Sequence, residues 1–200
     1  MFLLSTTDAC LFRRFFLPVE LRRIILHFLY LEITDDNINN AIVMSIPVNL
    51  RIFKQAGRLK FGHISYWDTS KVTCMDKLFY AFYEFNEDIS NWGVSNVTTM
   101  CSLIALSTGF NQPIGKWNVS KVTKMVSMFY SAFSFKQPIG KWNVSNVKDM
   151  TCMFQKARAF NQPLNAWDVS NVIYMAEMFD DARVFNQPLA SWNVSRTVAM

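Results

Sequence analysis

The sequence predicts an α/β fold in which one short strand–helix unit is repeated and stacked along one axis as a solenoid. First, the six tryptophans recur at one constant interval, at Trp67, Trp92, Trp117, Trp142, Trp167 and Trp192. Second, each tryptophan opens a copy of one motif that holds both strand-like and helix-like spacing. A fixed period of this kind is typical of proteins that stack one supersecondary unit on itself. We therefore expect five complete repeats and a partial sixth over residues 67–200.

Each repeat is predicted to contain one short strand and one short helix. With the tryptophan as position 1, apolar residues at positions 1 and 3 alternate with polar ones at positions 2 and 4, which is strand spacing. Positions 9, 12, 13 and 16 follow the stripe of an amphipathic helix, as in Met150, Met153, Phe154 and Ala157. Serine at position 4 or asparagine at position 5 stands where a helix N-cap is wanted. Proline at position 22 marks the return loop.

The tryptophan and methionine columns are predicted to form the core. A tryptophan ladder open to solvent could instead stack sugars or bases. Valine two residues after each of the last five tryptophans, however, favours a buried strand position.

The repeats also resemble a known family. The run Phe160-Asn-Gln-Pro-Leu-Asn-Ala-Trp-Asp-Val-Ser-Asn-Val172, followed by Met175, Met178, Phe179 and Ala182, is similar to the BspA-like leucine-rich repeats of mycoplasma surface lipoproteins. Such repeats are found also in algae and large DNA viruses, so a viral or protist protein fits as well. The resemblance covers residues 67–200. It implies a right-handed leucine-rich-repeat-like solenoid with a parallel sheet on one side.

Residues 1–66 are predicted to be an N-terminal helical segment that caps the open apolar end of the first repeat. Thr34 with Asp35 offers this capping helix an N-terminus. Residues 15–31 resemble the start of an F-box, which implies docking to an adaptor subunit of a ubiquitin ligase. The residues that would dock are Leu17, Pro18, Leu21, Ile25 and Leu29. The same spacing also describes any amphipathic helix.

The composition favours a cytoplasmic protein. The start of the chain has no basic segment before its apolar residues, as a signal peptide would, and no apolar run reaches the length of a membrane span. The four cysteines, Cys10, Cys74, Cys101 and Cys152, occupy different repeat positions, which favours reduced thiols.

The motifs of enzymes are missing from the sequence. No phosphate-binding loop or nucleophile elbow appears, and the two histidines have no partner at metal-ligand spacing. We therefore expect a non-enzymatic protein without cofactor or metal. The net charge is +5, with lysines concentrated over residues 116–158. A solvated face is favoured there over a polyanion site, and no nucleic acid is expected.

These observations favour an intracellular repeat scaffold that mediates protein–protein interaction through its variable positions. The candidate contact residues are Lys116, Lys121, Lys124, Lys141, Asn118, Asn143, Asp168 and Tyr174. Two alternatives stay open, an F-box-type substrate adaptor of a ubiquitin ligase and a cell-surface adhesin-like repeat protein. The sixth copy stops at position 9, so an uncovered fifth copy would also allow an end-to-end homodimer.

Overall fold

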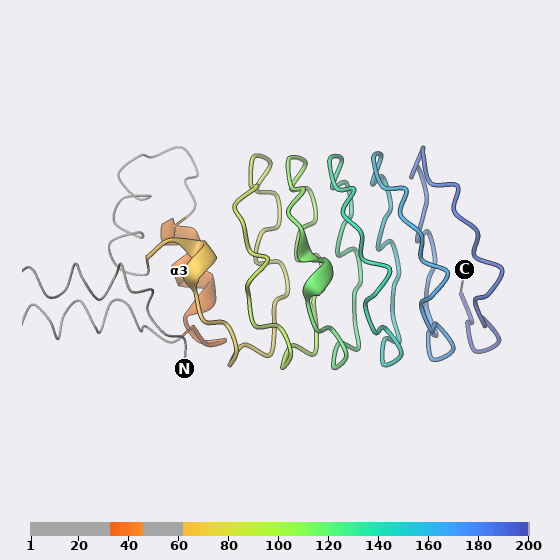
Figure 1. The fold of residues 1–200 in the computed structure, drawn as a ribbon, viewed down its shortest axis with the longest axis horizontal. Helices are drawn as coiled ribbons and strands as arrows, with labels where there is room; N and C mark the ends of the chain where they lie inside the picture. Colours follow the sequence, from red (N-terminus) through yellow and green to blue (C-terminus); the bar gives the residue numbers. More distant parts are fainter. Residues whose placement is uncertain (1–32, 46–61, 200) are drawn as a thin grey trace, which may run out of the picture. The chain divides into compact units, whose positions relative to one another are not determined.

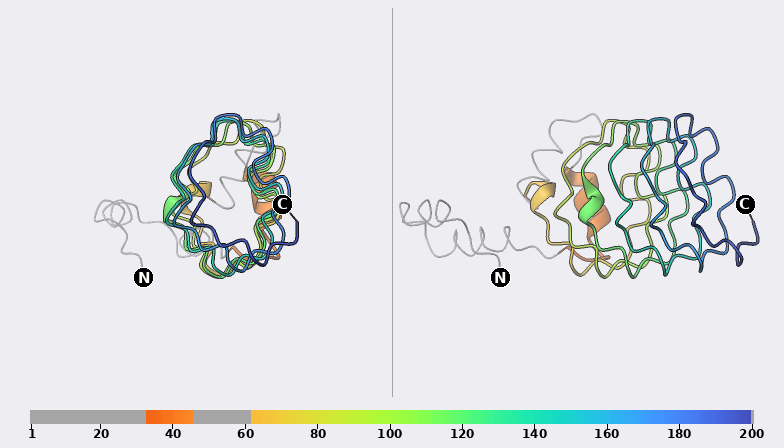
Figure 2. Two further views of the ribbon diagram at one scale, coloured as in Figure 1. Left: turned by 90° about the vertical axis from the view of Figure 1, so that its right-hand side faces the viewer. Right: turned by 45° about the vertical axis from the view of Figure 1, so that its right-hand side comes forward.

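The computed structural model describes residues 33–45 and 62–199, and the stretch from 62 to 199 forms a stack of coils. Each repeat makes one coil, and successive coils follow one another along a single axis (Figure 1). Viewed along the axis, the coils superpose around one ring (Figure 2). Coils 1 to 5 begin at Trp67, Trp92, Trp117, Trp142 and Trp167, and partial coil 6 begins at Trp192. The F-box-like segment 15–31 lies outside the described residues.

The predicted strand–helix solenoid of the leucine-rich-repeat type is wrong. The regular elements of the described chain are helix α3 (Ile38–Ser45) and two short 3-10 helices, η1 (Ile64–Tyr66) and η2 (Ile114–Lys116). Residues 33–45 and 62–199 contain no strand and no sheet. Neighbouring coils are joined by isolated parallel bridges at position 8, which are Cys74–Thr99, Thr99–Lys124, Lys124–Asp149, Asp149–Tyr174 and Tyr174–Ala199.

The segment predicted to be helical is a ribbon of β-turns. In coil 4, Met153 N donates to Met150 O at 3.1 Å and Ala157 N donates to Phe154 O at 2.9 Å, each closing a four-residue turn. The third residue of each turn has positive φ, as a type II turn requires. The same holds at positions 11 and 15 of coils 1 to 5, at Lys77, Ala81, Ser102, Leu106, Ser127, Ser131, Cys152, Lys156, Glu177 and Asp181. Positions 9, 12, 13 and 16 still point inward, so the apolar spacing fits this ribbon as well as a helix.

Hydrogen bonds between coils explain why the ribbon forms. In coil 3, the amides at positions 9, 11, 13 and 15 all donate to carbonyls of coil 4 at 2.9 Å, from Met125, Ser127, Phe129 and Ser131. The amides at positions 12, 14 and 16 close the turns inside the coil. The backbone donors therefore alternate between the coil and its neighbour. A helix would bond only to itself and leave the next coil without these donors.

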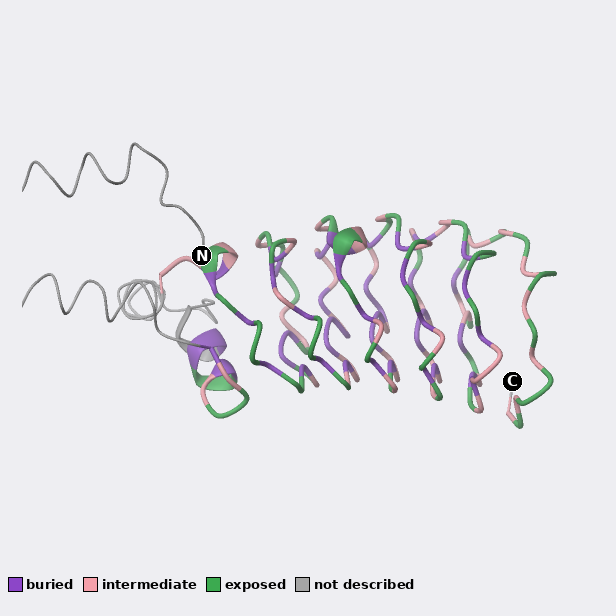
Figure 3. Cartoon of the chain, turned by 60° about the horizontal axis from the view of Figure 1, so that its bottom comes forward, coloured by how far each residue is buried: buried purple, intermediate pink, exposed green. Residues whose placement is uncertain are grey.

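The tryptophan column is core, as predicted. Trp142 stacks on Trp117 and Trp167 at centroid distances of 6.4 and 6.5 Å, with the rings within 4° of parallel. Its indole Nε1 donates at 3.2 Å to Ile114 O, which lies near the end of coil 2, shortly before Trp117. Buried residues, drawn in purple, recur along the successive coils in Figure 3. Because Trp67, Trp92, Trp117, Trp142 and Trp167 are at most 5 % exposed, these five rings are closed to sugars and bases, whereas Trp192 is only half-buried.

Asp35 accepts the hydrogen bonds of two backbone amides at the first edge of coil 1. In the interior, Thr98 N donates to Thr73 O one coil earlier, at 2.8 Å. Thr73 N instead donates to Asp35 Oδ1 at 2.9 Å, and Cys74 N donates to the same oxygen at 3.1 Å. The carboxylate thus replaces the carbonyl of a preceding coil. The predicted helix does follow, but it begins at Ile38 and not at Thr34 or Asp35.

Candidate functional site

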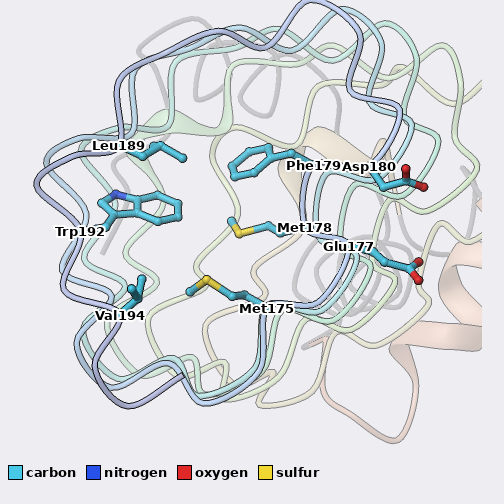
Figure 4. Close-up of a pocket in the computed structure, with 8 residues that line it drawn as sticks. All are labelled: Met175, Glu177, Met178, Phe179, Asp180, Leu189, Trp192 and Val194. Carbon is cyan, nitrogen blue, oxygen red and sulfur yellow. The ribbon is translucent and has the colours of Figure 1, made fainter. Parts of the chain in front are cut away.

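The structure does not bring the predicted contact residues together. Lys116, Asn118, Lys141, Asn143 and Asp168 flank the tryptophans at positions 25 and 2, and all are exposed. Lys124 and Tyr174 directly precede the inward methionines at position 9. The tryptophan wall and the methionine wall face each other across the coil interior, as Trp192 and Met175 show in Figure 4. The candidates therefore belong to different sides of the stack.

Several of these side chains already have a role in the fold. Asn118, Asn143 and Asp168 each accept a hydrogen bond from the backbone amide of the serine two residues on, at 3.0–3.2 Å. Hydrogen bonds from Ser170 also lower the pKa of Asp168. Lys121 Nζ donates to Asn96 Oδ1 of the preceding coil at 2.7 Å. These residues shape the turn after the tryptophan, and their polar atoms are only partly free for a partner.

The predicted N-cap at positions 4 and 5 is absent, because no helix follows. The asparagine at position 5 bonds to the preceding coil instead, as Asn146 Nδ2 does to Ser120 O at 2.7 Å.

Lys116, Lys124 and Lys141 are exposed and form no ion pair within the described part of the chain. They remain available to a partner, but neither a cleft nor a neighbouring functional group distinguishes them from solvated surface lysines.

A second surface, which the sequence analysis missed, is the turn face, formed by the outward side chains at positions 10, 11, 14, 15 and 17. In coil 1 it carries Tyr80 and Tyr83, which are 47 % and 60 % exposed. Coils 2 and 3 continue it with half-buried Leu106, Tyr130 and Phe133. The coil-to-coil bonds Leu106 N to Tyr130 O and Gly109 N to Tyr83 O place these columns side by side. The sequence did hold one indication of this surface, because the two tyrosines of coil 1 fall outside the core columns.

Most charged side chains of the turn face lie in coils 4 and 5, whereas coil 1 carries Asp76 and the exposed Lys77. Lys156 Nζ lies 3.3 Å from Tyr130 Oη, and the Arg158 guanidinium lies 4.7 Å from the Phe133 ring centroid. Arg158 also pairs with Asp181 at 3.4 Å. The exposed tyrosines of coil 1 thus remain the open part of this face.

The interior of coil 5 opens into a cavity of about 430 Å³, which we call the end pocket. Apolar side chains from both walls line it, and Glu177 and Asp180 stand at its rim (Figure 4). The apolar residues are Met175, Met178, Phe179, Leu189, Trp192 and Val194. Their counterparts one repeat earlier are at most 3 % exposed, because the following coil covers each of them.

One wall of the end pocket also carries unused backbone donors. In coil 4, the amides of Cys152, Phe154 and Lys156 donate to coil 5 at 2.9, 2.9 and 2.7 Å. The corresponding amides of Glu177, Phe179 and Asp181 have no acceptor among residues 33–45 and 62–199. An apolar cavity therefore lies beside a row of hydrogen-bond donors.

One further polar cluster belongs to the fold. His63 Nδ1 lies 2.9 Å from Ser65 Oγ and accepts from Ser65 N at 3.3 Å, while His63 Nε2 lies 3.2 Å from Glu87. The order serine, histidine, carboxylate is that of a catalytic triad. Here, however, His63 is the N-cap of η1, and its hydrogen bonds to Ser65 are local capping bonds.

The structure also bears on the cysteines, on metal binding and on membrane spans, within the residues that it describes. Cys74, Cys101 and Cys152 are free, and burial is the main cause that raises the pKa of Cys74 and Cys152. Within the described ranges, no group of His, Cys, Asp and Glu residues could hold a metal ion. No helix of the same ranges is long and apolar enough to cross a membrane.

The fold and its surfaces define a class of protein. It is a repeat protein that stacks short, equivalent coils around a tryptophan core. The chain belongs to the family described as "Mycoplasma protein of unknown function, DUF285", which it matches over residues 49–151 and 115–200. This agrees with the resemblance to mycoplasma repeat proteins, but not with the strand–helix architecture inferred from it. No curated protein and no solved structure matches the chain. The F-box-like segment 15–31 precedes the matched residues, and both the ligase-adaptor and the adhesin readings stay predictions.

Proposed function

We propose that this protein is a non-enzymatic scaffold that binds another protein through the turn face. The observation that carries the proposal is the exposure of Tyr80 and Tyr83 beside the half-buried Leu106, Tyr130 and Phe133. Tyrosine is enriched in protein interfaces, because it buries a large, rigid ring and offers a hydroxyl for hydrogen bonding.

The construction of the stack supports this function. The core columns repeat from coil to coil, whereas the turn-face columns change, for example from Tyr80 to Ala105, Tyr130, Gln155 and Asp180 at position 14. Backbone bonds between coils hold each of these residues in register with the next. A surface ordered in advance loses little conformational entropy when it binds, which favours recognition by a partner.

The test compares two sets of exposed tyrosines. A partner captured with the full chain is purified, and its Kd is measured for the wild type, for the double variant Tyr80→Ser/Tyr83→Ser, and for Tyr66→Ser. Tyr66 is 87 % exposed but precedes coil 1 and lies outside the turn face, so it is the matched control. We expect the double variant to weaken binding at least about tenfold, as interface hot spots do, and the control to leave Kd unchanged. Equal effects of the two variants, or an unchanged Kd for the double variant, would refute the assignment.

A further inference from the structure

We infer that the turn face binds an acidic segment of its partner, in which a carboxylate is held by Lys156 and Arg158 and apolar side chains pack on coils 1 to 3. This inference rests on the proposed function, because it concerns the same face, and it adds the chemical class of the partner. Lys156 and Arg158 occupy positions 15 and 17 of coil 4, on either side of the inward, buried Ala157. Both cations therefore extend outward on the turn face.

Aromatic rings of coil 3 hold the two cations in place. Lys156 Nζ lies 5.4 Å from the centroid of the Tyr130 ring and donates to Tyr130 Oη at 3.3 Å. The Arg158 guanidinium lies 4.7 Å from the centroid of the Phe133 ring. Each cation thus has a cation–π contact that orders it before a partner arrives. Ordered side chains lose less conformational entropy on binding, which distinguishes this pair from freely rotating surface lysines.

The charge of these two cations is only partly neutralised. Lys156 has no ion pair among residues 33–45 and 62–199. Arg158 lies 3.4 Å from a carboxylate oxygen of Asp181, which Arg183 binds more closely, at 2.8 Å. This contact shows that a carboxylate suits the guanidinium, and it leaves most of the N–H donors of Arg158 for another acceptor. Because the two cations repel each other, a carboxylate that approaches both is attracted by both.

The neighbouring charges determine where the segment lies. In coil 5, Glu177 and Asp180 have no ion pair within the described ranges and would repel an acidic segment. Coils 2 and 3 have no charged side chain at the turn-face positions. In coil 1, Asp76 is half-buried and accepts from two groups of coil 2, so the exposed Lys77 is the charge that a partner meets there. Glu84 is also exposed, but at position 18 it stands outside the turn face. The favourable path therefore runs from coil 4 over coils 3 and 2 toward coil 1.

The spacing of the coils sets the length of the segment. Parallel neighbours lie about 4.8 Å apart, so coil 4 stands about 14 Å from coil 1. An extended chain rises about 3.3 Å per residue. A carboxylate at Lys156 and Arg158 and an apolar side chain at the exposed Tyr80 and Tyr83 are then separated by about four residues of the partner.

Two synthetic peptides provide the probe. Both carry a fluorescent label and a C-terminal amide. The glutamate peptide is Leu-Leu-Gly-Ser-Gly-Glu-Glu, and the glutamine peptide, Leu-Leu-Gly-Ser-Gly-Gln-Gln, has the same shape without the charge. Anisotropy reports binding to the full chain at low ionic strength, where exposed ion pairs are least screened. We expect saturable binding of the glutamate peptide and about fivefold weaker binding of the glutamine peptide, a size typical of two exposed ion pairs.

A pair of charge variants tests the location. Lys156→Gln/Arg158→Gln should remove the preference for the glutamate peptide. The matched control, Lys116→Gln/Lys141→Gln, removes the same charge from exposed lysines outside the turn face and should keep the preference. An unchanged unfolding midpoint will show that each variant folds. Equal losses in the two variants would mean that only the net charge of the chain matters, which would overturn the inference.

A third variant tests the direction of approach and cannot be explained by misfolding. Glu177→Gln/Asp180→Gln should bind the glutamate peptide about twofold more tightly, because it removes two repelling carboxylates. Weaker or unchanged binding of this variant, equal affinity of the wild type for both peptides, or no saturation below about 1 mM peptide would contradict the inference. So would displacement of the peptide by inorganic phosphate at concentrations where acetate has no effect, because the site would then select phosphate.

The two proposals on the turn face can fail separately. The variant Tyr80→Ser/Tyr83→Ser is tested on a captured partner, whereas the peptides test the carboxylate site formed by Lys156 and Arg158. Loss of tight partner binding in the tyrosine variant, together with equal binding of the two peptides, would overturn this inference and leave the proposed function in place.

Discussion

Replacing Ser127 by glycine should stabilise this protein, although glycine is usually destabilising inside regular structure. Ser127 occupies position 11 of coil 3 with φ of 52°, and its amide donates to Thr151 O at 2.9 Å. Its side chain has no hydrogen bond within the described residues. A glycine would therefore keep the backbone bond, lose no side-chain partner, and remove the steric conflict of Cβ in the left-handed region.

The expected magnitude is a difference between two effects. A left-handed conformation costs an L-residue about 1–2 kcal/mol, which glycine avoids. Glycine in turn has a more flexible unfolded state, which costs about 0.5–1 kcal/mol. The balance predicts a gain of about 0.5–1 kcal/mol in the free energy of unfolding. If the segment were the amphipathic helix that the sequence predicts, the same substitution would lower stability by about 0.5 kcal/mol, because glycine is the weaker helix former.

Urea unfolding of the full chain distinguishes the two outcomes by sign. Ser134→Gly is the matched control, because Ser134 lies in the same coil, is exposed, and is not among the residues with positive φ. We expect the midpoint to rise for Ser127→Gly and to fall for Ser134→Gly, with an unchanged slope for both. A fall of similar size in both variants would refute the turn-ribbon explanation.

Three further substitutions test the packing between coils. Trp142→Ala should cost about 3–5 kcal/mol in urea unfolding, because it removes a buried ring that stacks on both neighbours; a loss below about 1 kcal/mol would mean that the column is not core. Gly140→Ala should cost about 1–3 kcal/mol, because its Cβ would lie 2.5 Å from Pro163 O, and Gly93→Ala, with its nearest atom at 3.1 Å, should cost less. Asp35→Ala should cost about 1 kcal/mol at pH 7, as the loss of a cap does. Partial burial raises the pKa of Asp35, but the hydrogen bonds from Thr73 and Cys74 outweigh it and hold this pKa below the ordinary 3.8. The stabilisation by Asp35 is thus present above pH 3.8 and is lost as the pH falls through the lower pKa of the folded state. The difference in free energy of unfolding between wild type and variant should therefore narrow at pH 3. A difference in free energy of unfolding that stays constant with pH would show that the charge of the Asp35 carboxylate does not stabilise the fold.

Much of the molecule follows from the sequence alone. The constant period requires equivalent coils, and the spacing of Trp142, Met150, Phe154 and Phe160 identifies the residues that face inward. These predictions depend only on which side chains avoid water, and hydrophobic burial is largely independent of the backbone conformation that achieves it. A helix near Thr34 also follows, although it begins at Ile38.

The tertiary structure alone decided between helix and turns. An apolar spacing of i, i+3, i+4 and i+7 fits both, because both bring those four positions to one side. The choice depends on whether the amides at positions 9, 11, 13 and 15 find acceptors in the following coil. Those acceptors exist only when the coils are stacked. The hydrogen bonds to them offset the free-energy cost of the left-handed residues, which local propensity disfavours. The turn face, the role of Asp35 and the donor row of the end pocket all result from these bonds between coils.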